Sequence, residues 1–264
     1  MGKKDEINSH IFIPKSILNR FATIDEKKRK IIKYIDCRDM QIKTSTTSSF
    51  NTKLGYYREQ NEKTLSREAE CKIGNVIRKI QDIDDDKLIN RKDVEYIFKY
   101  LAYQIIRTEY FTKELNKKLG IDIKSSFIKN ELIKEEMELN TIYNVIKDND
   151  IHVIINNSGT QFVLPINSMY TFNPNSNEYT WILILSPNIA ISFMQKGTIK
   201  ELSKCKDNSK LRIIEFRKEQ EDIINMFNLR AIGTEYKDCS EMKYVVGLEE
   251  ELNYLLSIID KNKE

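Results

Sequence analysis

The chain has 264 residues, of which 40% are hydrophobic and 31% are charged, so it can bury a sizeable core and is too apolar to be a disordered chain. Its 43 Lys and Arg residues against 40 Asp and Glu give a net charge of +3, a balance that does not call for a nucleic-acid or anionic-membrane partner. The strongest apolar run, Trp181 to Leu185, is far too short to span a bilayer, so we expect no membrane partner.

The cysteines and the N-terminal residues favour a cytoplasmic protein. The four cysteines lie far apart and form no CxxC pair, which is typical of reduced thiols and not of a disulfide framework or a thiolate zinc site. The opening residues MGKKDEINSH lack the apolar stretch of a signal peptide. We therefore expect a cytoplasmic location.

The N-terminal quarter is expected to mix strands with helix. His10 to Ala22 begins extended and turns helical after Pro14, because the fixed φ of proline suits a first helical turn. Lys30 to Asp36 alternates as a strand does, and Gln41 to Phe50 is either its partner or a long loop. Thr64 to Gln81 has its apolar residues on one helical face.

A helix from Asn90 to about Lys118 is the clearest predicted element. Asn90 is a suitable N-cap, and Asp93 stands three residues later as in a capping box. Apolar residues recur at helical spacing and tyrosines occupy a second face, which is typical of a helix covered on both sides. We expect it to be central to the fold, with a further helix over about Ile123 to Ile146.

Strands are predicted to follow, and then helices. Ile151 to Ile155 and Gln161 to Ile166 flank the turn residues Asn157 to Thr160 and predict a hairpin. Tyr179 to Leu185 predicts a strand buried on both faces. The remaining predicted elements are two amphipathic helices and a strand between them: Ile213 to Leu229, Ile232 to Tyr236 and Leu248 to Ile259.

These elements predict an α+β fold, a mainly helical single domain with one small antiparallel sheet. The domain is expected to span residues 1–264, with a helical part over about 1–150 and a sheet-containing part over about 151–264.

Several separated segments resemble, in order, a bacterial family of unknown function, domain-of-unknown-function family 4238. The segments are His10-Ile-Phe-Ile-Pro14 with Leu18 and Phe21, Glu70 ahead of Ile80, Gln104-Ile-Ile-Arg107-Thr108, Gln161 to Ser168, Leu185-Ser186-Pro187 and Asn225. The resemblance covers about residues 9–236 and implies no established activity. The family's turn has an acidic Ser-Asp pair where this chain has Pro165 and Ile166, so an activity that needs that aspartate would be altered or lost here.

Four polar residues within the resembling segments form the candidate site: His10, Glu70, Gln104 and Arg107. On a helix Gln104 and Arg107 are neighbours on one face. If these groups met in a cleft, His10 would be a catalytic acid or base, and Glu70 a second acid–base group or a metal ligand. Arg107 would bind a phosphate, with Gln104 orienting it. Alternatively, Arg107 pairs with Glu70 across two packed helices, and the pair is structural.

No metal or cofactor is indicated by the sequence. His10 and His152 are the only histidines, and no HExxH or His/Cys cluster is present. His152 alternates with apolar neighbours as an ordinary strand residue does, and Asp84 to Asp86 is typical of a solvated loop. Phosphate-loop and nucleophile-elbow motifs are absent, so the cofactor remains unknown.

Two functions follow as hypotheses. The first is a hydrolase acting on a phosphate-containing ligand, in the most specific form a nuclease with a nucleic acid as partner, in a bacterial defence or mobile-element setting. The second is a non-catalytic binding or regulatory module in which the same polar residues are structural. Ile166 in place of the acidic turn residue favours the second.

Overall fold

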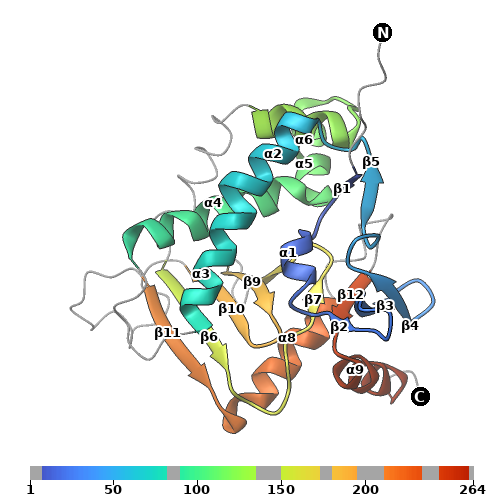
Figure 1. Ribbon diagram of the computed structural model, residues 1–264, viewed down its shortest axis with the longest axis vertical. Helices are drawn as coiled ribbons and strands as arrows, with labels where there is room; N and C mark the ends of the chain where they lie inside the picture. The colour runs from blue at the N-terminus through green and yellow to red at the C-terminus, as the bar shows by residue number, and fades with distance from the viewer. Residues whose placement is uncertain are drawn as a thin grey trace. The chain divides into compact units, whose positions relative to one another are not determined.

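The computed structural model describes residues 8–81, 90–134, 150–172, 180–194, 211–233 and 244–261 (Figure 1). The chain divides into two compact units, one of Met1–Ser16 with Phe50–Asp148 and one of Ile17–Ser49 with Asn149–Glu264. We call them the helical unit and the sheet unit. That the chain forms one domain over 1–264 stays a prediction.

The helical unit pairs one short ribbon with a set of helices. Strands β1 (Asn8–His10) and β5 (Thr52–Leu54) are antiparallel. The helical segments are α2 (Glu59–Thr64), the π-helical segment η1 (Leu65–Glu70), α3 (Cys71–Gln81), α4 (Arg91–Arg107), α5 (Glu109–Leu119) and α6 (Ser125–Lys134). The predicted helix over Thr64 to Gln81 therefore starts earlier. The helix predicted over Ile123 to Ile146 is found as α6, and its second half, 135–146, lies outside the described residues.

Helix α4 is the centre of the helical unit, as the sequence predicts. It contacts α3, η1, α5 and α6, and the residues from Tyr100 to Gln104 are all buried. The predicted N-terminus is confirmed, because the Asn90 side chain accepts from the amides of Lys92 and Asp93 while Asp93 accepts from the Asn90 amide. This capping box fixes where α4 begins, and with it the positions of the polar residues at its other end.

The predicted continuation of that helix to Lys118 is wrong, because the chain breaks at Thr108. Thr108 is extended, with ψ at 144°, and its hydroxyl accepts from the Phe111 amide as the N-cap of α5. The apolar periodicity runs through the break, so it gave no sign of one. The break places Arg107 as the last residue of α4 and Glu109 as the first residue of α5.

The sheet unit carries two five-stranded sheets. Its first strands are β2 (Thr23–Ile24), β3 (Lys30–Asp36) and β4 (Gln41–Thr46), preceded by the short helix α1 (Lys15–Leu18). The later elements are β6 (Asp150–Asn156), β7 (Leu164–Pro165), β8 (Met169–Phe172), β9 (Thr180–Ser186), β10 (Ile189–Met194), β11 (Leu211–Phe216), η4 (Lys218–Gln220), α8 (Glu221–Gly233), β12 (Tyr244–Gly247) and α9 (Glu249–Lys261).

Strand pairing corrects two predictions. One sheet has the order β11-β6-β10-β9-β8, and the other has β2-β3-β12-β7 with β4 also on β3. The predicted hairpin over Ile151 to Ile166 is therefore wrong, because β6 and β7 lie in different sheets. The predicted helix over Ile213 to Leu229 begins as strand β11, which lies parallel to β6, and becomes helical only in η4 and α8.

Other predictions for this unit are confirmed. Lys30–Asp36 is a strand, Gln41–Thr46 is its partner, β9 is buried along Ile182 to Ser186, and the last helix is present. The predicted strand near Ile232 is not found, since α8 runs to Gly233 and the rest of that range lies outside the described residues.

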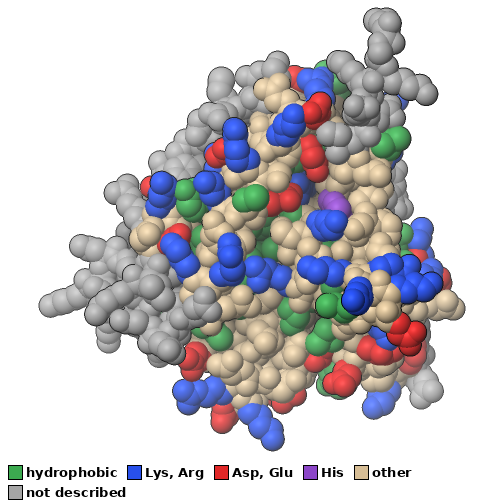
Figure 2. Space-filling view, viewed as in Figure 1, with side chains coloured by type: hydrophobic (Ala, Val, Ile, Leu, Met, Phe, Trp, Pro, Cys, Tyr) green, Lys and Arg blue, Asp and Glu red, His purple; other side chains and the backbone are tan. Residues whose placement is uncertain are grey.

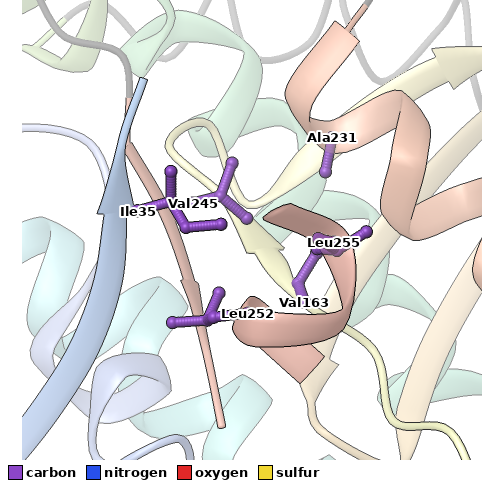
Figure 3. Packing of buried hydrophobic residues seen from close by; sticks show 6 residues of the cluster. All are labelled: Ile35, Val163, Ala231, Val245, Leu252 and Leu255. Carbon is purple, nitrogen blue, oxygen red and sulfur yellow. The ribbon is translucent and has the colours of Figure 1, made fainter. Parts of the chain in front are cut away.

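The α+β class is confirmed, but the described residues contain three sheets, not one small one. The core of the sheet unit joins the second sheet to α8 and α9 (Figure 3). Its fully or almost fully buried members are Ile35, Val163, Ala231, Val245, Leu252 and Leu255.

Gly247 ends β12 where this core leaves no room for a side chain. A Cβ atom there would lie 3.0 Å from side-chain carbons of both Val163 and Leu252. We expect Gly247→Ala to lower the free energy of unfolding by about 1–3 kcal/mol, because overpacking a close-packed core forces neighbours off their rotamers. Chemical denaturation measures the loss. An unchanged midpoint would mean that the two side chains move aside freely. Gly74→Ala is the matched control, because nothing lies within 4 Å of its added Cβ.

Candidate functional site

Arg107 is the centre of a buried polar cluster in the helical unit. It is 2% exposed, and its Nη2 donates to Glu70 Oε1 at 2.7 Å. Its guanidinium carbon lies 5.8 Å from the ring centroid of Tyr57. Burial by itself lowers the pKa of Arg107, but the adjacent Glu70 carboxylate outweighs it and raises the pKa above its usual value. Arg107 is therefore charged while enclosed.

Glu70 reaches Arg107 from the π-helical segment η1. Helices α2 and α3 and the segment between them run on without a break in Figure 1. A π-turn hydrogen-bonds from residue i to i+5 and so takes in about one additional residue. Such turns are frequent at functional sites. The side chain of Glu70 is 19% exposed, so it connects the buried guanidinium with solvent.

The same π-turn brings Glu62 to the cluster. In a regular α-helix, eight residues would leave Glu70 roughly 80° around the axis from Glu62. With about one residue absorbed by the π-turn, the spacing acts as seven residues, or nearly two full turns, and both carboxylates lie on one face. The charges of Arg107 and Glu70 both act on Glu62, which agrees with this placement.

The carboxyl group of Glu62 lies in surroundings that favour its neutral form. Burial raises its pKa, the charge of Arg107 opposes that effect, and the charge of Glu70 adds to it. The nearby Ser9 hydroxyl lowers the pKa of Glu62 slightly and so offsets a small part of the increase. Sequence reasoning missed Glu62, because its spacing from Glu70 does not fit an α-helical face and no residue type marks a π-turn.

Several polar atoms of the cluster have no hydrogen-bond partner among the described residues. They are Arg107 Nε and Nη1, both amide atoms of Gln104, and Glu62 Oε2. Gln104 and Ser9 are fully buried, and Gln104 is on the same face of α4 as Arg107, three residues before it. An unsatisfied buried polar group costs about 1–3 kcal/mol, so this number of them in one cluster is unusual for a purely structural core.

A second buried charge pair lies close by. Lys129 of α6 is 0% exposed, and its Nζ donates to Glu109 Oε1 at 2.6 Å. The ammonium also lies 4.8 Å from the ring centroid of Phe12 and 5.5 Å from that of Tyr56. Burial lowers the pKa of Lys129 to about 8, with Glu109 opposing and Arg107 adding to the effect. No sequence pattern indicates this pair, because a lysine on a helix is ordinarily solvated.

The structure therefore brings together three of the four predicted residues, Glu70, Gln104 and Arg107. His10 follows Ser9 on β1, and successive strand side chains point to opposite faces. Because Ser9 is the β1 residue that meets Glu62, the side chain of His10 points to the other face of the ribbon. The predicted pairing of Arg107 with Glu70 is present, and the predicted acid–base role of His10 has no support from this geometry.

The described part of the chain bears on the expectations about metal ligands, surface charge and membrane spans. There, no group of three or more His, Cys, Asp and Glu is arranged to hold a metal ion, while Asp84 to Asp86 lies outside it. His152 is buried within strand β6. Figure 2 shows Lys and Arg interspersed with Asp and Glu over α2 and α3. None of the described helices is long and apolar enough to cross a membrane.

Together, the fold and the cluster define an α+β protein with a buried Arg–carboxylate site in its helical unit. The model of the family described as Protein of unknown function (DUF4238) matches residues 9–232, so the chain belongs to that family. No curated protein and no solved structure matches the chain. Ile166 is buried in the sheet unit.

Proposed function

We propose that the helical unit hydrolyses a phosphate-containing substrate, with nucleic acid as the substrate class to test first. The observation that carries the proposal is the buried Arg107, which gives one nitrogen to Glu70 and keeps two without a partner among the described residues. Arginine is well suited to hold phosphate oxygens, because its planar guanidinium offers several donors in a fixed geometry.

The role of each residue in the proposed reaction follows from its position in the cluster. Arg107 and Gln104 hold the phosphate oxygens, and Glu70 does the acid–base work, because it contacts Arg107 and also reaches solvent. Glu70 takes a proton from the attacking water as the new P–O bond forms, and returns it to the oxygen that leaves. His10 has no role in this proposal, since it lies on the far face of β1.

The test is cleavage of end-labelled DNA and RNA by the pure protein with Mg²⁺, Mn²⁺ or a chelator. We expect wild-type cleavage and a loss of about 100-fold or more in Glu70→Gln, the size typical of removing an acid–base group. Glu59→Gln is the control, because Glu59 lies on the same helical run and its side chain is 57% exposed. Cleavage by Glu70→Gln at the wild-type rate would refute the role of Glu70, and no cleavage under any condition would refute the nuclease form.

The second candidate is a non-catalytic binding or regulatory module. The observation that favours it is the closed contact itself, because Arg107 is almost fully buried against Glu70 at 2.7 Å. Glu70→Gln is expected to lower the melting temperature under both proposals, because it leaves Arg107 buried without its partner. The binding or regulatory module differs in that the wild type has no cleavage activity for the substitution to remove.

A further inference from the structure

The unpaired atoms around Arg107 define what can occupy the centre of the cluster. Nε and Nη1 carry most of the guanidinium's N–H donors, and they lie in an almost fully enclosed position. The amide nitrogen of Gln104 is a further donor without a partner among the described residues. Donors from α4 therefore predominate, which suits an anion.

The acceptors narrow the choice of anion. Glu62 Oε2 and the amide oxygen of Gln104 also lack partners in the described part of the chain. A carboxyl group beside an anion is favourable only when a proton is shared between them, so the anion must be one that carries or accepts a proton near neutral pH. Phosphate meets this condition, because a phosphate monoester has a second pKa near 6. Sulfate stays fully ionised at that pH.

The burial of the cluster also limits which kind of phosphate group can bind. Ser9, Gln104 and Arg107 are buried, whereas Glu62 and Glu70, which share one helical face, are only partly buried. A phosphodiester within a polymer continues on both sides and needs two openings. A terminal phosphate needs only one, and the face of Glu62 and Glu70 is the side on which the described cluster meets solvent.

We propose that the cluster of Ser9, Glu62, Gln104 and Arg107 is a binding site for a terminal phosphate group. The proposal rests on the proposed function and deepens it, since the substrate becomes a phosphomonoester or a phosphate-ended chain. A free phosphate ion has the same chemistry and is the simplest probe of the site.

The experiment measures thermal unfolding and isothermal titration of the full chain with inorganic phosphate, and with sulfate at matched ionic strength. The informative variant is Gln104→Leu, which replaces a buried amide without partners by an apolar group of similar size. We expect it to keep or raise the melting temperature without phosphate, because its unsatisfied polar atoms are gone. Its affinity for phosphate is expected to fall at least 10-fold. A residue with only a structural role would not combine these two results.

Competition experiments distinguish the sources of the phosphate group, and one further variant is the control. Oligonucleotides with 5′- or 3′-phosphate are expected to compete with inorganic phosphate, and those with hydroxyl ends are not, if the group comes from a nucleic acid. If no phosphate-ended chain competes, the proposal stands with free phosphate as the ligand. Glu59→Gln is expected to bind phosphate as the wild type does. Equal effects of phosphate and sulfate, or unchanged phosphate binding in Gln104→Leu, would overturn the proposal.

The outcome is separable from that of the proposed function. Phosphate binding that depends on Gln104, with no cleavage of any substrate, keeps the terminal-phosphate site and rejects the hydrolase. Cleavage at internal positions without phosphate binding keeps the hydrolase and rejects the terminal-phosphate site.

Discussion

Replacing Glu109 by glutamine is expected to lower the free energy of unfolding by about 3 kcal/mol, the low end of the range for breaking a buried ion pair. The substitution keeps the shape but leaves the Lys129 ammonium in a fully buried site without an opposite charge. The low end applies because Glu109 itself is 21% exposed. Glu109 is also the first residue of α5, where a negative charge stabilises the helix N-terminus.

Denaturant unfolding at pH 7 measures this loss. Glu59→Gln is the matched control, since its partner Lys63 is exposed and such surface pairs contribute little to stability. The double variant Glu109→Gln with Lys129→Met should recover part of the stability, because no charge is then left buried. Similar small losses in Glu109→Gln and Glu59→Gln would show that water reaches Lys129.

The stability of the protein is expected to rise between about pH 8 and pH 10 because of Lys129. Its pKa in the folded protein is about 8, below the usual value for lysine of about 10.4 in the unfolded chain. Between these two values the unfolded chain binds more protons than the folded protein, so raising the pH favours folding. The difference corresponds to a gain of about 3 kcal/mol by pH 10.

The measurement is the free energy of unfolding at several pH values, for the wild type and for Lys129→Met. In Lys129→Met, we expect the free energy of unfolding not to rise between about pH 8 and pH 10. Above about pH 10 the trend reverses, because burial raises the pKa of Tyr57 and ionisation of unfolded tyrosine then favours unfolding. A flat wild-type profile from pH 8 to pH 10 would mean that Lys129 keeps its ordinary pKa.

Local signals predicted the elements whose ends are marked by side chains. Asn90 and Asp93 predicted the start of α4, and the alternation of Lys30 to Asp36 predicted β3 with its bounds. The break at Thr108 was not predictable, because one extended residue leaves the apolar pattern intact. The hairpin after β6 failed because strand alternation does not identify the partner, and β6 pairs with β10 and β11.

Part of the candidate site was predicted, because some of its residues are brought together by regular helical spacing. Gln104 and Arg107 share a face of any α-helix, so their proximity follows from spacing alone. The contact of Arg107 with Glu70 was predicted as one of two alternatives. Glu62 and the Lys129–Glu109 pair were missed, since charged residues on helices are ordinarily solvated and a π-turn changes which of them share a face.

The two units interleave along the chain, and this has a consequence for the order in which the protein is made. The sheet unit takes Ile17–Ser49, gives way to the helical unit, and resumes at Asn149. Strand β3 leaves the ribosome long before β12, yet Ile35 of β3 pairs with Val245 of β12. Until β12 emerges, one edge of β3 lacks its partner, and an unpaired strand edge can join another chain. A nascent chain therefore exposes this edge throughout the synthesis of the helical unit.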